Sequence, residues 1–577
     1  MTMHFASELY KRTLDSDNYG KVLTLLLLFA AIIIFTGIGL RSPWPADEPR
    51  FAEVAREMVS TGNWLIPMRG GEAYPDKPPV FMWAIALFYW LSGNLKVAFL
   101  LPNALCSLLT LFLVFDLGTR LWNIKTARNA ALLLLLFPQF IIQAKVAQID
   151  AMVTAWITLG CYGLLRHFLL GPNWKWYFIA WGMMGLGIIT KGVGFLPVFL
   201  LLPIAGYQLA GKKISENTFT RKGLYGPAVM LGVIALWLVP MLLYVWINGS
   251  QELIQYRNNI LFKQTGERYV NAWHHIEPWY YYLLDVIPGL WFPALLLIVA
   301  YAKKIVSAIR MQPQIAILFC WVICVLAFFS LSPGKRGVYI LPALPMFSLA
   351  LAASITPFTQ VRWFERLLGV ILWGLGGAMV LTGILALARL PALTKAITTN
   401  LNAIALLVIL IGALWLTIQY LLHKKSSMLR MGASMSMTWL LISLFGYPLL
   451  EPMRTPEIIL KNAEKITGPG GELGLINFKE QFILFSPLNI THFSYLAPVE
   501  QQERNGWQWM QEGEHRYLIV RQNQPLSCIN TAQGQMLGKA HGDEWVLISK
   551  QDLTPDCEKP THRELFFTPK PAAWLNL

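Results

Sequence analysis

A long series of apolar runs constrains this chain more than any other feature of its sequence. Runs of about 20 apolar residues, the length that crosses a bilayer as a helix, recur between residues 22 and 450. Only 14% of the 577 residues are charged and 55% are hydrophobic, a balance that excludes a soluble globular or disordered protein. The sequence therefore predicts a polytopic α-helical membrane protein.

The basic residues between these runs predict its orientation, because short loops rich in lysine and arginine stay cytoplasmic. The basic clusters fall on one side if the apolar run at 80–91 does not cross the membrane. That run would be only about 18 Å long as a helix, so we expect it to lie in the interface. We therefore predict about 13 spans, a cytoplasmic N-terminus and an external C-terminus. The net charge of +15 then reflects cytoplasmic loops rather than a nucleic-acid-binding surface.

Hydropathy divides the chain into two predicted domains. Residues 1–450 form the transmembrane domain, whose second large external loop spans 248–278. Polar and turn-forming residues become common from residue 451, and the runs ELGLINF, RYLIVR and EWVLIS indicate strands. We therefore expect a small external α/β domain at 451–577. Its two cysteines, Cys528 and Cys557, would form a disulfide only in an oxidising compartment, and the sequence leaves that pairing open.

The first external loop, residues 41–96, gathers an unusual number of charges. Residues 49–62 predict an amphipathic helix, with Asp47 or Glu48 as its N-cap and Gly62 as its end. We expect this helix to lie in the membrane interface with its carboxylates at the membrane surface. We interpret the loop as the floor of an active site.

Several cations fall on the external side in this topology, although charges at helix ends of an apolar protein are costly and usually mark function. Lys191 lies between two apolar runs in GLGIITKGVGF, where a snorkelling side chain is the alternative reading. Lys77 follows Asp76 before two prolines, where an ordinary ion pair of an exposed loop is the alternative. Converging cations indicate an anionic ligand, and a phosphate on a lipid fits best. The external cations include Arg50, Lys77, Lys191, Arg257, Lys335 and Arg336.

External acids accompany these cations. Asp150 begins a predicted helix in AQIDAMVTAW, where it serves either as an N-cap or as a site acid. Capping does not explain Asp76, which lies in an extended turn before the prolines. His274 lies in NAWHHIEPWYYYL, where an aromatic belt at the interface explains most of the pattern. The other reading is that His274 joins Asp76 in holding a cation.

The motifs ADEPRFAEVAREM, YPDKPPVFMW, QIDAM, ITKG, NAWHHIEPWYY and KRGVYILPALP together resemble the lipid-carrier glycosyltransferases of the GT-C fold. These are related to the protein O-mannosyltransferases, and the bacterial aminoarabinose–lipid A transferases are the most similar branch. The resemblance covers about residues 20–360. It implies transfer of a sugar from a polyprenyl (undecaprenyl) phosphate donor to lipid A or another envelope glycan, lipid or protein. The reaction would take place on the periplasmic face of the bacterial inner membrane. Apart from the resemblance, we expect a monomer that binds no nucleic acid.

The resemblance also implies roles for particular residues. Asp47 corresponds to the essential acid of the first loop, and Lys77 and Lys191 to the residues that hold the donor phosphate. Arg50 and Tyr339 would assist them. We expect a single displacement that inverts the anomeric carbon, with Asp47 orienting or deprotonating the acceptor while the cations stabilise the departing phosphate.

Further candidates complete the predicted site. No cofactor is required, but Asp76 and His274 match positions that hold a divalent metal in the aminoarabinose transferases, where Glu is usual at the position of Asp76. Glu48 and Asp150 are added as catalytic acids, and Arg257 and Lys335 as ligands of the donor phosphate.

Two other functions use similar residues. A lipid or polysaccharide transporter would also collect external cations, but it predicts repeated halves and charges near the bilayer midplane, neither of which the sequence shows. A glycan ligase or polymerase would use the same carrier lipids and is distinguished by moving a chain rather than one sugar. A structural membrane subunit would leave the external acids and bases unexplained.

Overall fold

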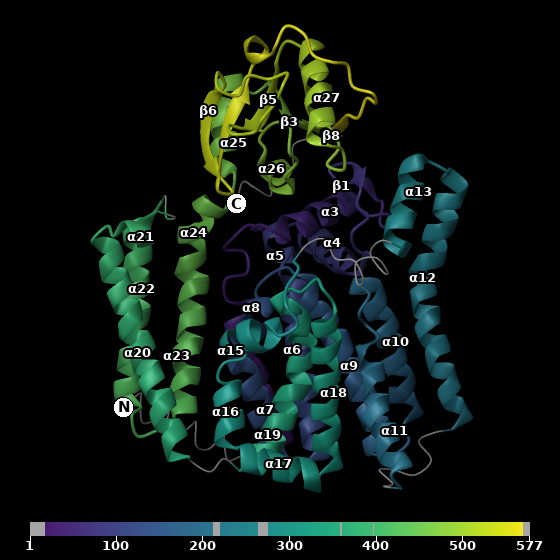
Figure 1. Cartoon of the computed structure of the whole chain (residues 1–577), viewed down its shortest axis with the longest axis vertical. Helices are drawn as coiled ribbons and strands as arrows, with labels where there is room; N and C mark the ends of the chain where they lie inside the picture. The colour runs from purple at the N-terminus through teal and green to yellow at the C-terminus, as the bar shows by residue number, and fades with distance from the viewer. Residues whose placement is uncertain are drawn as a thin grey trace.

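The computed structural model describes residues 18–211, 220–262, 275–357, 361–395, 397 and 399–568. A large helical domain is capped at one end by a domain built on a six-stranded sheet (Figure 1). The predicted fold class, a multi-pass helical membrane protein with a C-terminal α/β domain, is confirmed. The C-terminal domain rests on helices of the loop at residues 41–96, so this loop lies between the two domains (Figure 1).

Within the described residues, seven helical segments are long and apolar enough to cross a membrane, or up to nine if each of two bent pairs is one span. The seven are α5–α6 (Leu95–Leu121), η2–α12 (Arg221–Asn248), α18 (Pro313–Leu331), η5–α19 (Gly337–Ile355), α20 (Arg362–Leu387), α22 (Leu401–Leu421) and α23–η6–α24 (Ser427–Arg454). The bent pairs are α7 (Ile124–Leu136) with α8 (Pro138–Ala144), and η4–α15 (Tyr282–Leu290) with α16 (Ala294–Ala300). The count of about 13 spans stays a prediction.

Other helices complete the described part of the helical domain without meeting that criterion. They are α2 (Tyr19–Phe35), α9 (Ile149–Leu169), α10 (Trp174–Lys191), η1–α11 (Leu196–Leu209), α13 (Gln251–Asn258), α17 (Ala302–Met311) and α21 (Pro391–Thr394). Helices α9 and α10 pack against each other and carry the site described below on their adjoining ends.

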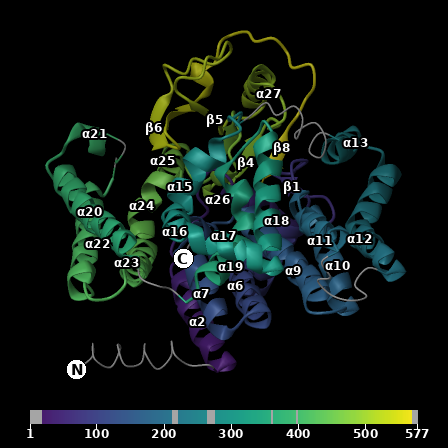
Figure 2. The ribbon, with the colours of Figure 1, turned by 60° about the horizontal axis from the view of Figure 1, so that its bottom comes forward.

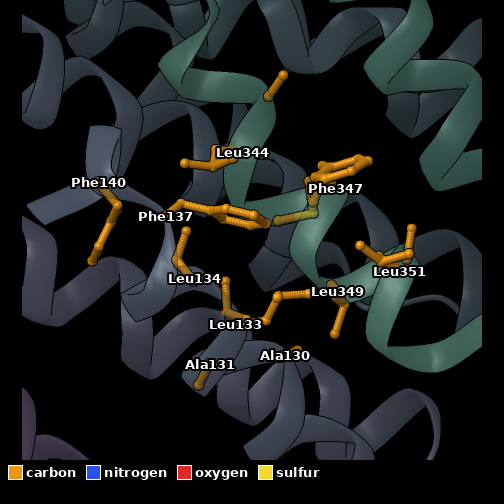
Figure 3. Close-up of a cluster of buried hydrophobic side chains, with 14 of the residues drawn as sticks. Ala130, Ala131, Leu133, Leu134, Phe137, Phe140, Leu344, Phe347, Leu349 and Leu351 are labelled. Carbon is orange, nitrogen blue, oxygen red and sulfur yellow. The ribbon is translucent and has the colours of Figure 1, made fainter. Parts of the chain in front are cut away.

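The core of the helical domain includes the region where α7 meets α19 (Leu344–Ile355) (Figure 3). The rings of Phe137 and Phe347 lie with their centroids 6.1 Å apart in this cluster. The outer helices differ, because they expose large apolar side chains such as Leu236 on α12 (77% exposed) and Val370 on α20 (69% exposed). Figure 2 shows α12 and the α20–α22 pair on opposite flanks of the domain. An apolar exterior of this kind is suited to lipid.

Three short helices at residues 48–98, the last of which begins the α5–α6 segment, lie on the side of the helical domain that faces the C-terminal domain (Figure 1). They are α3 (Glu48–Thr61), α4 (Val80–Ser92) and α5 (Leu95–Ala98). Helix α4 has 13 residues, about 20 Å, which is shorter than a bilayer core and agrees with the prediction that residues 80–91 do not cross. Gly62 ends α3 in the left-handed conformation (φ 73°), as predicted.

The polar face of α3 is buried, which differs from the expected position at the membrane surface. Glu53 is fully buried and accepts hydrogen bonds from Arg56 at 2.8 and 2.7 Å. Glu57 accepts the backbone N–H groups of Gly70 (2.5 Å) and Gly71 (3.1 Å), and burial together with the nearby Glu53 raises the pKa of Glu57. The carboxylate of Glu57 therefore holds a protein turn, whereas Glu53 pairs with Arg56 of the same helix.

That turn belongs to a short antiparallel hairpin, β1 (Met68–Arg69) and β2 (Glu72–Ala73). The hairpin is contacted from above by the C-terminal domain and from the side by α13, where Glu252 accepts the Ala73 N–H at 2.7 Å. It leads directly into the turn that carries Asp76 and Lys77.

The C-terminal domain has a mixed sheet in the order β6-β7-β5-β3-β4-β8, with β3 parallel to both β4 and β5. Its strands are β3 (Glu472–Leu475), β4 (Ile490–His492), β5 (Arg516–Arg521), β6 (Gln535–Ala540), β7 (Asp543–Ile548) and β8 (Phe566–Thr568), and its helices are α25 (Glu457–Thr467), α26 (Glu480–Phe485) and α27 (Val499–Gln511). The strands predicted from ELGLINF, RYLIVR and EWVLIS are β3, β5 and β7. Cys528 and Cys557 form a disulfide.

Candidate functional site

Asp47 connects three distant parts of the chain just before α3. Its Oδ2 accepts a hydrogen bond from Arg336 Nη2 at 2.9 Å and another from Gln148 Nε2 at 3.0 Å. Asp47 occupies the N-cap position of α3, as predicted, but its side chain makes no capping hydrogen bond. Burial would raise the pKa of Asp47, but Arg336, Arg50 and the Gln148 hydrogen bond outweigh burial and lower it. Asp47 is therefore held as an anion.

A second ion pair lies beside the first. Asp150, in the first turn of α9, pairs with Lys191 at the end of α10, and the Lys191 ammonium lies 4.5 Å from the ring centroid of Tyr339. Gln148 occupies the N-cap position of α9, so capping does not explain Asp150. Lys191 is held by an acid and an aromatic ring, which disfavours the snorkelling alternative. Arg336 lies within electrostatic range of Asp150 and Tyr339, so the two ion pairs form one cluster.

Of the adjacent cations in KRGVY, Arg336 faces this cluster and Lys335 does not. Lys335 is 3% exposed and donates from Nζ to the carbonyl oxygen of Glu277 at 2.7 Å. Its backbone N–H donates to the carbonyl of His275 at 2.9 Å. The predicted phosphate ligand Lys335 is thus directed away from the cluster, because its side chain joins the segment around residue 335 to the segment around Glu277.

Glu48 stabilises the fold of the first loop. Its carboxylate is 5% exposed and forms a two-oxygen ion pair with Arg41, with Nη2 to Oε1 at 2.6 Å. It also accepts the backbone N–H groups of Trp44 and Ala147, each at 2.8 Å. With both oxygens engaged by four donors, Glu48 has no free lone pair for chemistry. We assign it a structural role rather than the predicted catalytic one.

The turn at residues 74–79 places Asp76 and Lys77 immediately before α4. Arg50 on α3 faces this turn, since its charge is stabilised by Tyr74, Glu480 and Asp76. Burial would lower the pKa of Arg50, but these neighbours raise it above its usual value. The Arg50 Nε also donates to Glu480 Oε1 at 3.3 Å, so a residue of the C-terminal domain reaches the site.

One predicted site residue, Arg257, makes its described contacts outside this cluster, and another lies outside the described residues. Arg257 lies in the last turn of α13 and donates to Asn258 Oδ1 at 2.9 and 3.1 Å. His274 lies outside the described residues, so the predicted metal site with Asp76 stays a prediction. In the part of the chain that the structure describes, no three His, Cys, Asp or Glu side chains converge in a way that would hold a metal ion.

The structure adds positioning residues that the sequence did not indicate. Gln139 donates to the carbonyl of Gly337 at 2.7 Å and accepts from Trp291 Nε1 at 2.5 Å, which holds the segment that follows Arg336. Tyr282 is fully buried within electrostatic range of Tyr339 and Asp150. Gln139 lies in no motif, and Tyr282 lies in NAWHHIEPWYYYL, whose tyrosines the sequence did not distinguish from an aromatic belt.

Comparisons with known proteins show what this chain is similar to. Residues 76–244 match the family described as "Dolichyl-phosphate-mannose-protein mannosyltransferase". The chain is 31% identical over 361 residues to an undecaprenyl phosphate-alpha-4-amino-4-deoxy-L-arabinose arabinosyl transferase of Pectobacterium atrosepticum, a match that spans 61% of this chain and 62% of that relative. A transferase of the same name from Aeromonas hydrophila is 28% identical over 379 residues, 64% of this chain and 66% of the relative.

One solved structure resembles almost the entire chain. The crystal structure of ArnT from Cupriavidus metallidurans bound to undecaprenyl phosphate superposes with a TM-score of 0.69 at 18% identity, covering 92% of this chain and 99% of that one. Its apo form gives a TM-score of 0.66. The family resemblance drawn from the sequence motifs is thus confirmed as a similarity: residues 76–244 match the mannosyltransferase family, the chain is similar to aminoarabinose transferases over less than two thirds of their length, and it has the fold of ArnT.

Proposed function

We propose that this chain is a membrane glycosyltransferase that moves 4-amino-4-deoxy-L-arabinose from undecaprenyl phosphate to a lipid A-type acceptor. The carrying observation is the cluster in which Asp47 pairs with Arg336 while Asp150 and Tyr339 hold Lys191. It lies at the ends of membrane helices beneath an external loop, where a carrier lipid in the bilayer presents its phosphate. The enzyme would act on the periplasmic face of the bacterial inner membrane.

In the proposed reaction, an acceptor oxygen attacks the anomeric carbon of the sugar and forms a new C–O bond. The bond from that carbon to the phosphate oxygen breaks, and the electron pair leaves with undecaprenyl phosphate. Lys77, Lys191 and Arg50 stabilise the charge on the departing phosphate. The attack takes place opposite the leaving group, so the configuration at the anomeric carbon is inverted.

The electrostatics of Asp47 favour an acceptor that is itself a phosphate. Two arginines and Gln148 lower the pKa of Asp47, which makes its carboxylate a weak base. A hydroxyl acceptor has to lose its proton to such a base during attack, whereas a phosphate is already ionised and needs only to be positioned. We therefore assign Asp47 to positioning the acceptor, together with Arg336, and propose a phosphate of lipid A as the attacking group.

Transfer by the purified protein tests this proposal. Full-length protein in nanodiscs is incubated with undecaprenyl phosphate-aminoarabinose and lipid A, and lipid A is analysed by mass spectrometry for the addition of one aminopentose. Addition that disappears in Asp47→Asn supports the proposal. Lipid A of unchanged mass, with a different envelope lipid or glycan gaining the sugar, would reject this acceptor. The gain of a chain of sugars instead of one would favour the ligase or polymerase alternative.

A further inference from the structure

The C-terminal domain is hydrogen-bonded to the hairpin that precedes the Asp76–Lys77 turn. Glu72 of β2 accepts from Ser494 Oγ at 2.7 Å and from the Tyr495 N–H at 3.0 Å. The Tyr495 hydroxyl donates to the carbonyl of Ala73 at 2.5 Å. Glu72, Ala73 and Ser494 are buried and Tyr495 is half-buried, so most of the contact between the hairpin and the domain is shielded from solvent.

Gly70 shows how close this contact is. Its carbonyl oxygen lies 2.6 Å from Nε2 of His492, the last residue of β4. A Cβ at position 70 would lie 2.7 Å from the same His492 nitrogen and 2.8 Å from the ring of Phe478, and its φ is +68°. Only glycine fits here without displacing the domain.

Glu480 extends the contact from the hairpin to the site. It is the first residue of α26, its side chain is 12% exposed, and its Oε1 accepts from both Arg69 Nη1 (2.8 Å) and Arg50 Nε (3.3 Å). Arg69 is itself fixed, because its guanidinium lies 3.5 Å from the ring centroid of Tyr495. The Glu480 carboxylate of the C-terminal domain thus joins Arg69, which is fixed, to Arg50, which follows Asp47 by about one helical turn.

We propose that Glu480 is a positioning residue for the donor phosphate, acting through Arg50. This inference rests on the proposed function, in which Arg50 binds that phosphate. An arginine held through one edge of its guanidinium keeps other N–H donors for a second anion. Glu480 orders the long Arg50 side chain before the donor arrives, so that less conformational entropy is lost on binding. The soluble domain then completes a site whose other residues come from the membrane domain.

The proposal predicts a specific kinetic change in Glu480→Gln, which keeps the size of the side chain but removes its charge. Freeing one arginine side chain weakens donor binding by about three- to tenfold. The KM for the undecaprenyl phosphate-linked donor and the Kd for undecaprenyl phosphate itself should rise by that factor, whereas kcat changes less than twofold. Glu472→Gln is the matched control. Glu472 is another glutamate of the C-terminal domain that pairs with an arginine, but its partner is Arg516 (2.9 Å) and not Arg50.

A double-mutant cycle separates positioning from simple docking of the domain. In an Arg50→Gln background, Glu480→Gln should cause no further rise in Kd for undecaprenyl phosphate, because the residue it positions is already gone. An equal rise in Kd in both backgrounds would overturn the inference, and so would an unchanged Kd in Glu480→Gln. In either case, binding of undecaprenyl phosphate by the wild-type protein would leave the proposed function standing. Wild-type protein that does not bind undecaprenyl phosphate would overturn both.

Discussion

Helix α9 carries an acid–base cluster near each of two points along its length, and the two clusters are built differently. At its start, Asp150 pairs with Lys191 beside the Asp47–Arg336 pair. Twelve residues further along, about 18 Å by helical rise, Tyr162 donates to Asp116 of α6 at 2.6 Å. Asp116 also accepts from Tyr19 at 2.8 Å and from Arg120 Nε at 2.5 Å.

The difference lies in where the partners come from. Asp116 is completed by hydroxyl groups of adjacent helices and by an arginine one turn along its own helix, so this cluster holds helices together. Asp47 is completed by an arginine from a segment 289 residues away, and the cations around it come from loops and helix ends. Buried charge in a membrane protein is thus not by itself a sign of chemistry.

The largest test of this comparison is Asp47→Asn. Because the amide keeps the shape but loses the charge that faces Arg336, we expect kcat for sugar transfer to fall by roughly 10²- to 10⁴-fold. Initial rates of the purified variant, at matched protein concentration and with an unchanged melting temperature, would check this. A rate within fivefold of wild type would remove Asp47 from the mechanism.

Glu48→Gln tests whether Glu48, in the same loop as Asp47, has a structural rather than a catalytic role. The change leaves the buried Arg41 guanidinium without a counter-charge, so we expect a loss of roughly 3 kcal/mol in the free energy of unfolding. Thermal unfolding in detergent and the yield of monodisperse protein would measure it. The folded fraction should transfer sugar at close to the wild-type rate, and a folded but inactive variant would restore Glu48 to catalysis.

Asp116→Asn probes the other cluster. Two tyrosines can still donate to the amide oxygen and only the Arg120 charge pair weakens, so we expect a loss of about 1–2 kcal/mol in stability. Transfer kinetics should stay within about twofold of wild type. A large fall in kcat without unfolding would show that both clusters serve the reaction and that the Asp116 cluster is not merely structural.

The smallest expected effect concerns pH and the acid of the hairpin. Burial raises the pKa of Glu72 to about 7, although Ser494 and Tyr495 donate to it. A raised pKa in the folded state means that this group favours folding fully below about pH 4.5 and loses that contribution as pH rises through 7. Glu72→Gln should remove this dependence, so the variant should gain stability relative to wild type between pH 5 and pH 8, on the order of a degree or two in Tm. A constant difference across this range would contradict it.

The sequence predicted what depends on local pattern. The apolar runs, the short helix at 80–91, the end of α3 at Gly62 and the strands β3, β5 and β7 all follow from periodicity, length or turn chemistry. Candidates placed by a motif, such as Asp47, Lys191 and Tyr339, also meet in the structure.

What the sequence missed depends on tertiary packing. Adjacent cations such as Lys335 and Arg336 point to different surroundings, and only the fold of the segment decides which one faces Asp47. The carboxylates of α3 look like an exposed polar face until the hairpin covers them. Glu480 lies in no motif and its partner Arg50 is 430 residues away, so its part in the site is visible only once the domains are placed together.

The close approach at Gly70 ties the evolution of two distant parts of this polypeptide. A bulkier residue at position 492 or 478 would clash with the backbone at position 70. That position is already glycine, so no smaller residue there could relieve the clash. A chimera that joins the C-terminal domain of a relative to this helical domain should therefore fail to fold unless residues 68–73 are exchanged together with it. Substitutions in the hairpin and in strand β4, which faces it, should therefore covary among natural sequences.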